Sequence, residues 1–120
     1  MITDAAKTDS YLTKGLSPLL THLKSKGYDN DIYAFEILNE PEWMVTGEAG
    51  INNKINLKAL QSFVKKANHL IVEKGFKATV GSASLKWSCN CGPGCEGNWW
   101  GETGLSFVTV HYYDWMVTNG

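Results

Sequence analysis

An apolar stretch that ends abruptly in Asn39, Glu40 and Pro41 limits most strongly what this chain can fold into. It begins at Ile32 and reads IYAFEILNEPEW. Its apolar residues fall on both parities and include β-forming side chains, a pattern that favours a parallel strand buried on both faces. Because proline cannot donate a ladder hydrogen bond, the strand should stop at about Glu40. The sequence therefore predicts a strand over residues 32–40, with two polar side chains at its carboxyl end, where α/β folds hold ligands.

Two further strands are predicted, over residues 76–82 (FKATVGS) and 105–113 (LSFVTVHYY). An amphipathic helix over residues 56–74 should connect the first two strands, because its apolar residues form one stripe behind an Asn56 N-cap. The order strand, helix, strand implies parallel strands in a βαβ unit. Residues 84–104 form a long loop without a useful helical stretch.

A second main helix is predicted near the N-terminus, where leucines recur at helical spacing from Leu12 to Leu23. Pro18 follows Ser17, so this helix should start or kink there, and Gly27 is a natural C-cap. The predicted fold class is α/β, with about three parallel strands and two main helices in one domain.

The segment ILNEPEW resembles the acid/base strand of the (β/α)8-barrel clan of glycoside hydrolases, whose hallmark is Asn-Glu-Pro at the end of strand four. The pattern is most similar to glycoside hydrolase family 5, the cellulase and mannanase family. The resemblance implies a partial TIM barrel, covering about strands four to six. A complete barrel takes about 250 residues, whereas this chain has 120. We therefore expect an incomplete catalytic domain or a truncated gene model, with the remainder of the barrel in the missing chain.

The same resemblance implies a retaining endo-β-1,4-glycanase acting on a plant polysaccharide, either mannan or cellulose-like. Glu40 would be its general acid/base, and Asn39 would bind the 2-hydroxyl of the sugar. His111 and Tyr113 match a His-x-Tyr pair that lines the sugar site at the end of strand six. The family nucleophile, a Glu at the end of strand seven, lies beyond this chain, so the chain alone should be inactive. Without that neighbouring carboxylate, Glu40 should have a pKa closer to that of an ordinary Glu.

Two other acidic residues flank Glu40. Glu36 shares the parity of Leu38 and Glu40, so it is expected to point into the barrel as a structural carboxylate. Glu42 follows Pro41 and is interpreted as a solvated charge at the rim.

Five tryptophans in 120 residues provide candidate sugar platforms, because the apolar C–H faces of sugars stack on indole rings. The expected substrate-binding tryptophans are Trp43, Trp87 and Trp115. An alternative is a non-catalytic carbohydrate-binding module that uses the Trp-rich loop. The partner expected in either case is a β-linked polysaccharide or oligosaccharide.

Three cysteines, Cys89, Cys91 and Cys95, lie in the segment SCNCGPGCEG. A disulfide from Cys89 or Cys91 to Cys95 would pin this loop and would suit a secreted enzyme. Free thiols are the second interpretation. A metal-binding loop is the third, but three thiols without a fourth ligand at standard spacing are a weak zinc signal. No metal or cofactor is predicted.

The composition argues against two classes of partner. A net charge of −1 and the absence of arginine are unlike a nucleic-acid-binding surface. No apolar run approaches the roughly 18 residues of a membrane span, so no membrane is expected either. The family implies an extracellular location, although the first residues, MITDAAKTDSYL, contain no apolar signal core.

Overall fold

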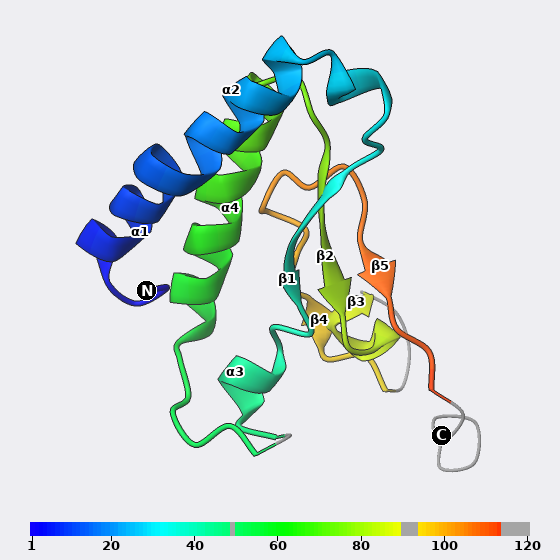
Figure 1. Cartoon of the computed structure of the whole chain (residues 1–120). Coiled ribbons are helices and arrows are strands. Elements are labelled where there is room, and N and C mark those ends of the chain that lie inside the picture. The colour runs from blue at the N-terminus through cyan, green and yellow to red at the C-terminus, as the bar shows by residue number, and fades with distance from the viewer. Residues whose placement is uncertain (49, 90–93, 114–120) are drawn as a thin grey trace.

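The protein is an α/β molecule in which helices cover one face of a three-stranded parallel sheet (Figure 1). The computed structural model describes residues 1–48, 50–89 and 94–113. The strands are β1 (Phe35–Asn39), β2 (Ala78–Ser82) and β5 (Thr109–Val110), in the spatial order β1-β2-β5. Both strand pairs are parallel, as the βαβ pattern predicted. The observed β1 is shorter than the predicted strand over residues 32–40, but it does end just before Glu40.

The connecting helix α4 (Leu57–Glu73) agrees closely with the predicted helix over residues 56–74. The side chain of Asn56 accepts a hydrogen bond from the backbone N–H of Lys58 at 2.7 Å, so Asn56 is the predicted N-cap. A short helix, α3 (Trp43–Thr46), precedes α4 in the loop that follows β1.

The N-terminal helix is continuous but changes its winding in the middle. It consists of α1 (Ala5–Tyr11), a π-helical turn (Leu12–Leu16) and α2 (Ser17–Ser25). The wide turn lies just before Pro18, which has no backbone N–H and cannot continue the regular ladder. The predicted disturbance at Pro18 is therefore a change of helical pitch. Figure 1 shows α1 and α2 lying alongside α4.

The core lies between these helices and the sheet. Both α2 and α4 bury their apolar stripes, and the helix-facing side chains of β1 and β2 complete the packing. One cluster of buried residues comprises Leu16, Leu20, Ala67, Ile71, Phe76 and Ala78, and the other comprises Leu60, Phe63, Val64, Val80 and Trp100.

The long loop after β2 contains a small structure of its own. It includes a 3-10 turn (Leu85–Trp87) and two antiparallel strands, β3 (Ser88–Cys89) and β4 (Gly97–Asn98). A disulfide joins Cys89 to Cys95, with 5.8 Å between the Cα atoms. The predicted loop disulfide is thus confirmed, with Cys89 as the partner of Cys95.

The third strand is much shorter than the predicted strand over residues 105–113. Leu105 and Val108 pack against the hydrophobic core. The carbonyl of Phe107 accepts a hydrogen bond from the Thr79 side chain at 3.1 Å, so a side chain replaces the backbone ladder there. Regular pairing is consequently limited to Thr109–Val110. No helix in the described part of the chain is both long and apolar enough to cross a bilayer.

Candidate functional site

Glu40 occupies an unusual backbone conformation at the carboxyl end of β1. Its φ angle is 46°, which places a non-glycine residue in the left-handed region. Such a residue typically costs on the order of 1–3 kcal/mol and persists only where its surroundings hold it in place. Its backbone N–H donates to the carbonyl of Gly81 at 2.6 Å, which anchors it to β2. The backbone therefore turns at the end of β1, and residue 40 is held there against β2.

Three side chains surround the Glu40 carboxylate. His111 Nδ1 lies 2.7 Å from Oε1, and the Tyr113 hydroxyl donates to the same oxygen. Trp43 Nε1 donates to Oε2 at 3.0 Å. The structure thus brings together four of the predicted site residues, although more than 70 positions in the sequence separate Glu40 from His111 and Tyr113.

These contacts lower the pKa of Glu40 from 4.5 to about 2. The hydrogen bond from Tyr113 is the largest cause, followed by that from His111, and both stabilise the ionised form. Burial acts in the opposite direction, and Trp43 adds a smaller lowering effect. The expectation of a pKa near that of an ordinary Glu is therefore wrong. The same contact with Glu40 raises the pKa of Tyr113.

The face of the sheet opposite the helices carries polar residues. Glu36 and Asn39 are both exposed there, although their separation in sequence is odd. A bulge between them changes the register, so that they pair with Thr79 and Gly81, which are two residues apart. The parity shared by Glu36 and Leu38 does not hold, because Leu38 packs against the core, whereas Glu36 is an exposed carboxylate on the face away from the helices, the side expected for it.

Gly81 leaves the space in which this cluster forms. A Cβ atom at this position would lie 2.8 Å from Glu36 Oε2 and 2.9 Å from His111 Nε2. Both distances are too short for a side chain to fit without displacing its neighbours. Glu36 and His111 thus approach β2 closely only because residue 81 has no side chain.

Glu42 is fully buried, so its interpretation as a solvated rim charge is wrong. Its carboxylate accepts hydrogen bonds from Ser82 Oγ at 2.5 Å, the backbone N–H of Ala83 at 3.1 Å and Trp100 Nε1 at 3.2 Å. Sequence reasoning missed this role because the donors lie 40 to 58 positions away. The one local signal was a second carboxylate immediately after the strand-ending proline.

The tryptophans divide into core and surface groups. Trp87, a predicted sugar platform, is completely buried and presents no face to solvent. Its ring packs edge-on against Trp43 at 5.3 Å between centroids, and its Nε1 donates to Glu96 at 3.1 Å. Trp43 is partly exposed beside Glu40, whereas Trp100 belongs to the core. Trp115 lies outside the described residues.

Nothing in the described ranges assembles a metal site from three or more His, Cys, Asp or Glu side chains. The disulfide uses two of the three cysteines that the metal-loop interpretation required. Cys91 lies outside the described residues.

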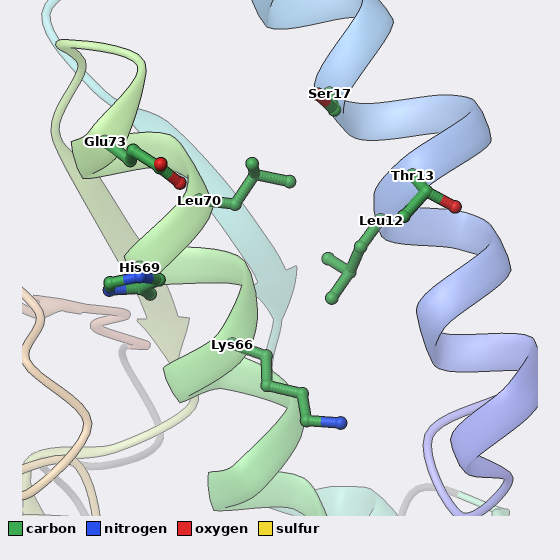
Figure 2. Close-up of a pocket in the computed structure, with 7 residues that line it drawn as sticks. All are labelled: Leu12, Thr13, Ser17, Lys66, His69, Leu70 and Glu73. Atoms are coloured by element: carbon green, nitrogen blue, oxygen red, sulfur yellow. The ribbon is translucent and has the colours of Figure 1, made fainter.

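A groove of about 360 Å³ lies elsewhere, between the N-terminal helices and α4 (Figure 2). Leu12, Thr13 and Ser17 line one side, and side chains from Lys66 to Glu73 line the other. It contains none of the predicted site residues. The candidate site is therefore the cluster around Glu40, at the opposite side of the sheet from this groove.

Comparison with protein-family models, curated proteins and solved structures finds no match for this chain. The functional interpretation consequently depends on the geometry of the site and on the sequence resemblance.

Proposed function

We propose that this chain carries the acid/base half of the active site of a retaining endo-β-1,4-glycanase of the family 5 type. Glu40 would be the general acid/base, and β1, β2 and β5 would correspond to strands four to six of a (β/α)8 barrel. The substrate would be a neutral plant polysaccharide such as mannan or a cellulose-like glucan.

The observation that most strongly supports this proposal is the contact of both His111 and Tyr113 with one oxygen of Glu40. The resemblance assigns these three residues to one sugar site, although they come from separate strand ends. Parallel pairing in the order β1-β2-β5 agrees with consecutive barrel strands. Asn39 is exposed on the same face of the sheet as Glu36, a position from which it could reach a hydroxyl of the bound sugar.

The electrostatics of Glu40 support inactivity of the chain by itself. A retaining glycosidase needs one carboxylic acid to protonate the leaving oxygen and a second carboxylate about 5–5.5 Å away. With a pKa of about 2, Glu40 is ionised at neutral pH and has no proton to give. A neighbouring nucleophile would raise this pKa by charge repulsion. We therefore propose that the remainder of the barrel supplies both the nucleophile and the proton affinity of Glu40.

The carbohydrate-binding module has less support. Its Trp-rich loop contributes two indoles, Trp87 and Trp100, that are almost completely inaccessible to a ligand. Trp43 and Trp99 remain partly exposed. Only Trp43 among them hydrogen-bonds to Glu40.

Oligosaccharide titration followed by NMR tests the proposal. Addition of mannotetraose or cellotetraose should shift the signals of Trp43, His111 and Tyr113, and Trp43→Ala should abolish these shifts. Leu85→Ala, which truncates an exposed apolar side chain, is the matched control and should leave them intact. Shifts confined to Trp99 would instead favour the binding module.

The inactivity proposal has a separate test. The purified chain should release no reducing sugar from mannan or carboxymethylcellulose. Robust hydrolysis that Glu40→Gln abolishes would contradict it, while Glu102→Gln, which alters an exposed carboxylate, controls for non-specific effects.

A further inference from the structure

We propose that Glu42 is a positioning residue, whose buried carboxylate holds the turn after β1 against the end of β2 and so fixes the direction of the Glu40 side chain. The proposal depends on the proposed function only for the acid/base role of Glu40. The position of Glu40 itself can be measured without any sugar.

The hydrogen bonds of Glu42 come from two separate segments. Ser82 and Ala83 at the end of β2 donate to it, and so does the indole of Trp100 in the long loop. Burying a carboxylate is costly unless several donors compensate for the lost water. These three hydrogen bonds provide that compensation, and together they fix the location of residue 42.

The same three-residue segment, Gly81 to Ala83, also holds the other parts of the site. The Gly81 carbonyl accepts from the Glu40 backbone N–H, and the Ser82 carbonyl accepts from the His111 backbone N–H at 2.9 Å. Glu40 and His111 are therefore aligned through a common support. A shift of the turn relative to β2 would change the distance between their side chains.

The backbone at Glu40 needs such a support. The left-handed conformation of Glu40 is unfavourable for a non-glycine residue. Pro41, which is completely buried, separates it from Glu42 by a single residue. Anchoring Glu42 on one side and the Glu40 N–H on the other fixes both ends of the strained turn.

Replacement of Glu42 by glutamine tests this role. The glutamine amide accepts hydrogen bonds only at its oxygen, so either the backbone N–H of Ala83 or the indole N–H of Trp100 must lose its acceptor. We expect the turn to shift, the contacts to His111 and Tyr113 to lengthen, and the pKa of Glu40 to rise by one unit or more. Carboxyl ¹³C NMR measures this pKa directly. The raised pKa of Tyr113 should fall towards its ordinary value in the same variant.

A purely electrostatic role for Glu42 predicts the opposite sign. Removing a negative charge near Glu40 would stabilise its ionised form and would lower its pKa. Glu102→Gln is the matched control and should change neither titration. Ser82→Ala removes one donor to Glu42, so it should raise the pKa of Glu40 by less than Glu42→Gln does. If Glu42→Gln does not fold, the pKa of Glu40 in Ser82→Ala tests the positioning role instead.

An unchanged or lowered pKa of Glu40 in a folded variant would overturn the positioning role. The chain could instead fail to bind oligosaccharides while the pKa of Glu40 still rises in Glu42→Gln. That result would contradict the glycanase proposal and leave the positioning role of Glu42 in place.

Discussion

Glu40 shows how three hydrogen-bonding side chains can lower the pKa of one carboxylate. The donors come from Tyr113, His111 and Trp43, and they hold its pKa near 2. Because the folded-state pKa lies below the ordinary value of 4.5, ionised Glu40 stabilises the fold above about pH 4.5. This contribution is lost as the pH falls through about 2. The site is therefore a stabilising element as well as a candidate catalytic group.

Glu40→Gln should consequently reduce stability at neutral pH but have little effect in acid. We expect a loss on the order of 1–3 kcal/mol at pH 7, reduced from the full linkage value because the side chain is 18% exposed. Urea unfolding at pH 7, 4.5 and 2.5 should show the difference between the two proteins shrinking as the pH falls. A difference that stays constant over this range would contradict the assigned pKa.

A substitution at Gly81 tests whether the lack of a side chain at this position lets Glu36 and His111 approach β2. Gly81→Ala would place Cβ within 3 Å of Glu36 and His111. We expect a loss of less than about 1 kcal/mol, because the atoms that must move are the ends of the Glu36 and His111 side chains and Glu36 is exposed. His111 should then withdraw from Glu40, and the pKa of Glu40 should rise.

Gly15→Ala is the matched control for this substitution. A Cβ at position 15 would meet only Tyr11 at 3.6 Å, which is ordinary contact. It should stabilise the N-terminal helix by roughly 0.5–1 kcal/mol. If Gly81→Ala and Gly15→Ala changed the unfolding temperature equally, a side chain at position 81 would fit without disturbing Glu36 and His111.

Among the helices and strands, the sequence predicted most accurately those features that neighbouring residues determine. The helix α4 and its Asn56 cap follow from a 3.6-residue period and one side chain, so the prediction was correct to within a residue at each end. The end of β1 followed from Pro41. The strand at residues 105–113 was overestimated because Leu105 and Val108 contribute to the core instead of to a regular ladder.

Features that depend on distant partners could not be predicted. The irregular register in β1 placed Leu38 on the opposite side of the sheet from Glu36, since parity assumes an unbroken register. The burial of Glu42 and Trp87 depends on the folded long loop, whose path no local pattern specifies. The contact between Glu40 and the His111/Tyr113 pair was anticipated only through the family resemblance.

The disulfide between Cys89 and Cys95 should support the long loop and, through it, the site. It closes a short loop in the sequence, which corresponds to a stabilisation of about 2 kcal/mol in the chain-entropy model. Glu96, next to Cys95, accepts the indole hydrogen bond of Trp87, which packs against Trp43. Replacing both cysteines by serine should lower stability by about this amount and shift tryptophan fluorescence to longer wavelength. Cys91→Ser is the control and should do neither.

The whole molecule is less compact than its length suggests. Its radius of gyration is 15.5 Å, whereas about 14 Å is typical of a compact domain of 120 residues. In the described part of the chain, neither the outer edge of β1 nor that of β5 pairs with another strand. Tyr33 and Tyr112 are 75% and 71% exposed near these strands. Open edges beside exposed aromatic side chains favour association.

Sedimentation velocity over a range of concentrations should therefore show reversible self-association of the purified chain. Replacing both Tyr33 and Tyr112 by serine should weaken it several-fold, because exposed aromatic area on the sheet side of the molecule is lost. Leu19→Ser, on the helical layer at 47% exposure, is the matched control and should leave it unchanged. If Leu19→Ser alone abolished association, the helices and not the sheet would form the contact, and the sheet face would need no further covering. Loss of association in the tyrosine variant only would place the contact on the sheet side of the molecule, the side that the proposed remainder of the barrel would cover.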